Sequence, residues 1–185
     1  MGTRALIGYL DTDQTPVKLT TTYNHYDGYP ENLGVGLEKF YNSDAKAEEI
    51  SNIGYISYLD PETGEWDAKN KSNPDVVTLP DNFNEAMEEI AYEIDKMGAD
   101  YGYIWDNENE EWITVKNYGI RKMTESLEMA LAHLKEKFSM LPERPDQAPE
   151  IPGFEGTRDA LDNLSIRETE EAFIRKMKHR AGIIK

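Results

Sequence analysis

Apolar and β-branched residues occur in three pairs of short runs along the first two thirds of the chain. Each pair flanks a polar segment rich in turn-forming residues, which is the pattern of a β-hairpin. We therefore expect hairpins over 5–23, 54–66 and 101–115, and a polar loop over 67–80.

Between the hairpins, apolar residues recur every three or four positions, which predicts amphipathic helices. The spacing indicates helices over 30–42, 45–50 and 119–138, and a long helix that begins after the cap residues 81–82 and ends at Gly98. This order of hairpins and helices favours an α+β fold. We expect a largely antiparallel sheet of hairpins, covered by helices on one side.

The end of the chain differs in composition from the rest. Residues 141–157 contain four prolines and two glycines, which is typical of an extended linker. We expect an acidic α+β domain over 1–140, this linker, and a C-terminal helix over 158–185 with a basic end. Three roles stay open for the helix: packing on its own domain, forming a homodimer with a second copy, or recognising another molecule.

Acidic residues dominate the composition. The chain has 36 Asp and Glu against 20 Lys and Arg, a formal net charge of −16. A body of this charge repels nucleic-acid backbones and anionic membranes, so we expect no direct nucleic-acid binding by it and attraction to a partner with a basic surface. Solubility alone is the other explanation. No apolar run approaches the roughly 20 residues that span a bilayer and there is no cysteine, so we expect a cytoplasmic protein.

Residues 20–34 hold the densest mixture of polar and aromatic side chains. A β-branched run leads into a turn at Asp27 and Gly28, and Pro30 suits the first turn of a helix. The turn has a structural explanation: His25 and Asp27 bond the turn backbone, and the tyrosines pack on the following helix. It is also a candidate binding site, formed by Tyr23, Asn24, His25, Tyr26, Asp27 and Tyr29.

An enzyme is the alternative function. His25 could act as a general base if Asp27 orients its imidazole. Asp11, Asp13 and Thr15 match the Asp-x-Asp-x-Thr signature of haloacid-dehalogenase-like phosphotransferases, whose first Asp attacks phosphorus beside Mg²⁺. These groups would make a small metal- or nucleotide-dependent enzyme. Because the strand returns at once as a hairpin, an Asp-rich turn is the preferred interpretation of the signature.

The acidic turn 106–111 could also bind a cation, but it lacks the spacing and the glycine of an EF-hand. Solvated charge is therefore the expected role of this turn. No set of His and carboxylate residues has the spacing of a metal site. We predict no cofactor, no metal and no catalytic residue.

The long helix after residue 82 carries the candidate partner-binding residues. Its apolar residues occupy one face, which leaves carboxylates on the outer face. We expect this outer face to attract the basic partner through Glu85, Glu88, Glu89 and Glu93.

The opening stretch from Met1 to Gly8, the hexapeptide His25-Tyr26-Asp27-Gly28-Tyr29-Pro30, and Tyr103-Ile104-Trp105 with Trp112 are similar to a group of small bacteriophage-encoded proteins. Members of the group carry His-Trp-Asp-Gly-Tyr-Pro, with Trp where this chain has Tyr26. The resemblance covers residues 1–116. It implies a phage origin and a place in the host-cell cytoplasm, and no activity. We therefore expect the protein to bind a host or phage protein, to occupy a basic surface that normally holds nucleic acid, and so to inhibit a host process.

Overall fold

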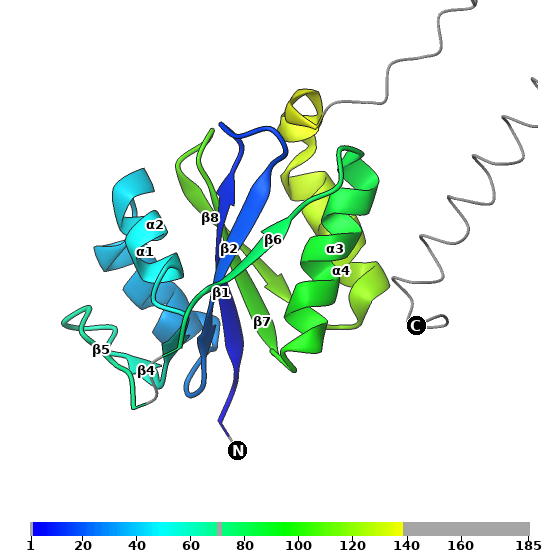
Figure 1. The fold of residues 1–185 in the computed structure, drawn as a ribbon. Helices are drawn as coiled ribbons and strands as arrows, with labels where there is room; N and C mark the ends of the chain where they lie inside the picture. Colours follow the sequence, from blue (N-terminus) through cyan, green and yellow to red (C-terminus); the bar gives the residue numbers. More distant parts are fainter. Residues whose placement is uncertain (1, 70–71, 139–185) are drawn as a thin grey trace, which may run out of the picture. The chain divides into compact units, whose positions relative to one another are not determined.

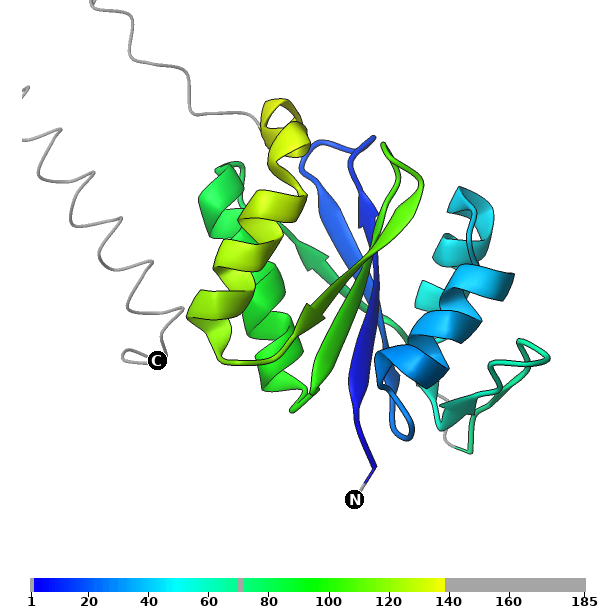
Figure 2. The same cartoon turned by 180° about the vertical axis from the view of Figure 1, so that it is seen from behind.

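The computed structural model describes residues 2–69 and 72–138, which belong to the first of two units of the chain, Met1–Glu143. The predicted linker over 141–157 and the predicted helix over 158–185 lie outside the described residues. Within the described part, a six-stranded sheet separates two layers of helices (Figure 1, Figure 2).

Two antiparallel hairpins form most of the sheet, and they confirm the first and third predicted hairpins. β1 (Ala5–Asp11) pairs with β2 (Lys18–Asn24), and β7 (Tyr101–Asp106) pairs with β8 (Glu111–Lys116). The hairpins meet through β1 and β7, which run parallel. The carboxyl ends of β1 and β7 therefore lie side by side at one end of the sheet.

The second predicted hairpin is confirmed around its turn, whereas the rest of the segment between these hairpins differs from the prediction. β3 (Tyr55–Ile56) pairs with β2 in parallel, whereas β4 (Tyr58–Leu59) and β5 (Trp66–Asp67) form a separate two-stranded ladder. β6 (Asp75–Thr78) lies in the predicted loop and pairs antiparallel with β2. Val76 of β6 is 57% exposed. Val77 is partly buried against the core. The β-branched run Val76-Val77-Thr78 is a strand signal, but it is too short to show an alternating pattern.

Helices cover both faces of the sheet, so the prediction of a sheet covered on one side is wrong (Figure 1, Figure 2). The reason lies in the inner strands. β1 and β7 are buried at almost every position and do not alternate, and such strands need a layer of helices on each side. The α+β class itself is confirmed.

One layer consists of α3 (Phe83–Lys96) and α4 (Ile120–Ala130), whose apolar residues share one core with the sheet. The Asn82 side chain accepts hydrogen bonds from two backbone N–H groups of the first turn of α3, as its place before the helix predicts. The predicted helix over 119–138 is two segments, because α4 is followed by the 3₁₀ helix η2 (Ala132–Lys137).

The other layer consists of the π-helical turn η1 (Pro30–Gly34), α1 (Val35–Phe40) and α2 (Asp44–Ser51). The first predicted helix is thus split between η1 and α1. Gly36 lets α1 approach the β4–β5 ladder, since a Cβ at this position would lie 2.8 Å from Cδ2 of Leu59. This close approach explains a glycine inside a helix, where it is otherwise unfavourable.

Candidate functional site

The predicted aromatic turn follows the end of β2 and is held by local hydrogen bonds. The Gly28 N–H donates to the Thr3 carbonyl (2.9 Å), and the Asn24 amide donates to the Tyr26 carbonyl (2.7 Å). Asp27 has a φ of 53°, in the left-handed region that Asp tolerates better than most residues. Local structure therefore accounts for much of the polar content of the turn.

Tyrosine rings pack around His25. Its Nδ1 lies 3.2 Å from the Tyr23 hydroxyl. The ring centroids of Tyr23, Tyr26 and Tyr55 lie between 4.3 and 6.2 Å from the centroid of the imidazole. No hydrogen bond or ion pair joins His25 to Asp27 in the described part of the chain. Among the described residues, the contact by which Asp27 would orient His25 as a general base is therefore not formed.

Tyr26 and Tyr29 are not buried by the following helix, on which the tyrosines were expected to pack. Their side chains are 47% and 37% exposed. Tyr29 contributes to η1 through its carbonyl, which accepts hydrogen bonds from the N–H groups of Asn32 and Leu33. The turn therefore presents tyrosine rings to solvent.

A polar hollow of about 330 Å³ lies against His25 and is lined also by Arg4, Gly98 and Asp100. Asp100 Oδ2 accepts a hydrogen bond from the backbone N–H of Arg4 (2.9 Å). Burial raises the pKa of the Tyr23 hydroxyl, and the nearby Arg4 guanidinium opposes this rise. Since a cation and an anion line the same hollow, it favours neither sign of ligand charge.

Asp11 and Asp13 lie at the far end of the β1–β2 hairpin from the aromatic turn. Asp11 is opposite Lys18 in the register, whereas Asn24, next to His25, lies at the other end. These ends are separated by roughly 20 Å at about 3.3 Å per residue. The hypothesis that one enzyme site combines His25 with Asp11 and Asp13 is therefore wrong.

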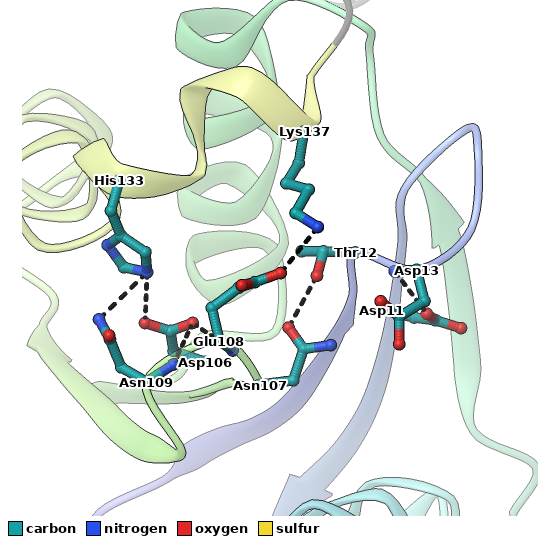
Figure 3. A network of polar contacts seen from close by, with 9 residues as sticks. All are labelled: Asp11, Thr12, Asp13, Asp106, Asn107, Glu108, Asn109, His133 and Lys137. Carbon is teal, nitrogen blue, oxygen red and sulfur yellow. Dashed lines mark hydrogen bonds and ion pairs between the residues drawn. The ribbon is translucent and has the colours of Figure 1, made fainter.

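Asp11 and Asp13 belong instead to a polar network at the carboxyl ends of β1 and β7 (Figure 3). Asp11 closes its own turn, because it accepts hydrogen bonds from the Asp13 N–H (3.2 Å) and the Gln14 side-chain amide (2.6 Å). This bonding is that of the expected Asp-rich turn. The Thr12 hydroxyl donates to Oδ1 of Asn107 (2.8 Å), across a sequence separation of 95 residues.

The centre of the network is Asp106, whose side chain is fully buried. Its Oδ1 accepts hydrogen bonds from the N–H groups of Glu108 (3.1 Å) and Asn109 (3.5 Å). Its Oδ2 lies 2.8 Å from Nε2 of His133, and Lys137 pairs with Glu108 at 2.9 Å. Because His133 and Lys137 both belong to η2, these contacts hold η2 against the β7–β8 turn (Figure 3).

Sequence reasoning missed His133 and the burial of Asp106. The prediction of solvated charge over 106–111 holds for Glu110 and Glu111, which are exposed, but not for Asp106. One signal could have found it. A carboxylate that continues the inward face of an apolar strand is buried, and a buried carboxylate requires hydrogen-bonding partners.

The outer face of α3 carries three of the four predicted partner-binding carboxylates. Glu88 is exposed, and Glu85 and Glu89 are partly exposed. Tyr92 is 43% exposed and lies three to seven residues after them, so the four side chains form one stripe along the helix. We call Glu85, Glu88, Glu89 and Tyr92 the acidic α3 face. The predicted inner face is confirmed by the burial of Phe83, Met87, Ile90, Ala91 and Ile94.

Glu93 is the exception, and the prediction that it shares the outer face is wrong. Its side chain is 4% exposed and pairs with Lys96 at 3.1 Å. Glu93 lies three residues after Ile90 and seven after Ala86, so helical geometry places it beside buried residues. The hydrogen bond from Lys96 to Glu93 raises the pKa of the Lys96 ammonium group.

A second concave surface lies on the other face of the sheet, between η1–α1 and β8. It has a volume of about 520 Å³. The Tyr103 hydroxyl donates to the Gly28 carbonyl (2.8 Å) and Trp112 Nε1 donates to the Tyr41 carbonyl (3.2 Å). These bonds fix the two buried rings as the floor of the surface. We call this surface the β8 groove; its lining includes Pro30, Val35, Glu38, Tyr103, Trp112 and Thr114.

These surfaces are made of side chains suited to binding, without a metal centre among them. Over residues 2–69 and 72–138, no group of three or more His, Asp or Glu is placed to hold a metal ion. In the same ranges, no helix has the length and apolar character needed to cross a membrane. Comparisons with protein-family models, with curated proteins and with solved structures found no match for this chain.

Proposed function

We propose that the protein binds a host or phage protein with a basic surface, and that it does so through the acidic α3 face. The observation that supports this proposal is the placement of Glu85, Glu88 and Glu89 around the exposed ring of Tyr92. Aromatic residues are enriched among those that contribute most to binding energy, and they act best inside a polar rim. The α3 stripe has this composition.

The net charge of −16 supports the same proposal. Charges of one sign on a surface accelerate association with a partner of the opposite sign more than they slow dissociation. A surface that normally holds nucleic acid is basic, and an acidic protein bound there excludes the nucleic acid. Inhibition of a nucleic-acid-binding protein in the host-cell cytoplasm is the consequence that we propose.

Charge reversal on α3 tests the proposal. The test variant replaces Glu85, Glu88 and Glu89 with Lys. It omits Glu93, because a second ammonium group buried beside Lys96 would unfold the helix. The matched control replaces the exposed Glu48, Glu62 and Glu65 with Lys, which changes the net charge by the same amount at sites outside α3.

Each full-length variant is immobilised and incubated with host lysate, and captured proteins are identified by mass spectrometry at two salt concentrations. The association rate of a purified partner is then measured. We expect the α3 variant to slow association at least tenfold and to flatten its salt dependence, and the control to slow it less than threefold. Equal effects of the two variants would mean that only bulk charge matters, and would contradict the proposal.

A further inference from the structure

The β8 groove is a second surface, which the proposed function does not use. β8 ends the strand order β3-β2-β1-β7-β8, so within the described ranges it has a strand neighbour on one side only. Trp112 and Thr114 are two residues apart on β8 and both line the groove. Because side chains on a strand alternate, a strand added to β8 would place every second side chain over the groove.

The groove accommodates one bulky apolar side chain. Its volume of about 520 Å³ is within the range of roughly 300–1,000 Å³ of ligand pockets. The polar atoms of Tyr103 and Trp112 already have partners, and Val35 on the groove is 46% exposed. Tyr103 is fully buried and Trp112 is 7% exposed, so the rings form the floor of the groove and Val35 supplies its most exposed apolar side chain.

The overall charge of the chain favours a basic ligand for the groove. Glu38 and Lys39 both line it and offset each other. Burial raises the pKa of the Tyr103 hydroxyl, and the neighbouring Tyr101 and Glu31 raise it further, which places Glu31 close to the groove. Lys116, on the same face of β8 as Trp112 and Thr114, lies 5.9 Å from the ring of Tyr101 and offsets Glu31. The charge that favours a basic ligand is therefore the net charge of −16 of the whole chain.

We infer that the β8 groove binds an extended basic segment of a partner protein, which pairs with β8 as an additional strand and inserts an aromatic side chain between α1 and β8. In this mode the backbone hydrogen bonds supply affinity, and the pocket and the charges supply specificity. A second copy of this chain fits less well as the occupant, because two bodies of the same high charge repel each other.

Disulfide trapping tests this inference, and the chain is suited to it because it contains no cysteine. Thr114→Cys introduces one thiol at an exposed position of the groove. The probe is the peptide acetyl-Lys-Phe-Thr-Cys-Thr-Phe-Lys-amide. When its cysteine lies opposite position 114, one Phe lies over Trp112 in either strand direction. Two comparison peptides replace both Phe with Ala, or both Lys with Glu.

Each peptide is supplied as its mixed disulfide with 2-mercaptoethanol and is equilibrated with the full-length variant in a fixed excess of 2-mercaptoethanol. The thiolate at position 114 attacks the peptide sulfur of this disulfide and releases 2-mercaptoethanol, and mass spectrometry gives the fraction of protein linked to peptide. We expect the probe to be captured at least tenfold more efficiently than either comparison peptide. The matched control is Val76→Cys, an exposed position on β6, which pairs with β2 and lies outside the groove. There we expect a preference of less than twofold.

A further variant separates the groove from the strand edge. Val35→Trp, combined with Thr114→Cys, fills the groove without changing β8 and should reduce the preference for Phe to less than threefold. Equal capture of the three peptides at position 114, or the same preference at position 76, would overturn the inference. A disulfide-linked dimer of the Thr114→Cys protein that outcompetes the probe would also overturn it, because a second copy would then be the occupant. None of these results depends on the acidic α3 face.

Discussion

Replacing His133 with Ala should lower the free energy of unfolding by about 2–3 kcal/mol. Asp106 is fully buried, and its Oδ2 makes no hydrogen bond among the described residues but lies 2.8 Å from Nε2 of His133, an ion-pair contact. The same nitrogen lies 3.2 Å from the Asn109 side-chain amide. Hydrogen bonds to charged groups contribute about 1.5–3 kcal/mol. Breaking a fully buried ion pair costs about 3–5 kcal/mol. The His133 side chain is 34% exposed, so water replaces part of the lost bond and the lower range applies.

A double-mutant cycle isolates this pair from the rest of the network. Asp106→Asn keeps an oxygen for the N–H groups of Glu108 and Asn109 and removes the buried charge, so we expect a loss of about 1–2 kcal/mol. In the double variant with His133→Ala, no carboxylate is left without its partner. The combined loss should therefore be smaller than the sum of the single losses by about 1–2 kcal/mol.

Urea unfolding, followed by circular dichroism and by tryptophan fluorescence, measures these values. Lys137→Ala is the control, because its ion pair with Glu108 has both side chains substantially exposed and should contribute little. Losses below about 0.5 kcal/mol for both His133→Ala and Asp106→Asn, or strictly additive losses, would refute the argument that His133 compensates a buried charge.

Three further predictions concern the core. Burial raises the pKa of Tyr9 and Tyr103 above the ordinary value of 10.0, so the folded state keeps protons that the unfolded chain releases. Stability should fall by up to about 2.7 kcal/mol per unit as the pH rises above 10; unchanged urea midpoints between pH 9 and 11 would contradict this. Asp44→Ala removes the acceptor of the Tyr9 hydroxyl (3.0 Å) and of Trp105 Nε1 (3.1 Å) and should cost about 2–3 kcal/mol in urea unfolding, against an unchanged midpoint if water replaces the carboxylate. Gly28→Ala would place a Cβ 2.8–3.0 Å from atoms of the N-terminal strand, backbone included, and should cost about 2–3 kcal/mol; a melting temperature equal to that of the wild type would contradict it.

The elements that sequence predicted best are those whose local signals agree with one another. α3 has a cap residue, a helical apolar period and a glycine directly after its end, and the structure places it within two residues of the prediction. β6 offers only the short β-branched run Val76-Val77-Thr78, and its strand depends on pairing with β2. The helices on the second face were predicted as elements, but their side of the sheet was not, because hydrophobic periodicity says which face of a helix is buried and not against which face of the sheet.

The candidate sites were predicted less well, because each depends on contacts distant in sequence. His25 and Asp27 are neighbours in the chain, yet the imidazole contacts Tyr23 and Tyr55, and Tyr55 comes from a strand that lies 30 residues later. Glu93 is charged like the residues of the outer stripe of α3, but its angular position around the helix places its side chain among buried residues. The β8 groove has no sequence signature, since it arises from the fit of α1 beside an edge strand.

The parallel contact between β1 and β7 determines the arrangement of these surfaces. It brings the Thr12 turn beside the Asn107 turn and makes β8, the next strand, the edge of the sheet. It also leaves α3 on one face and α1 on the other. A partner bound to the acidic α3 face therefore does not cover the β8 groove. Because both surfaces share the electrostatic field of one acidic body, raising the salt concentration should weaken binding at both, whereas Lys substitutions on α3 should act mainly on the nearer one.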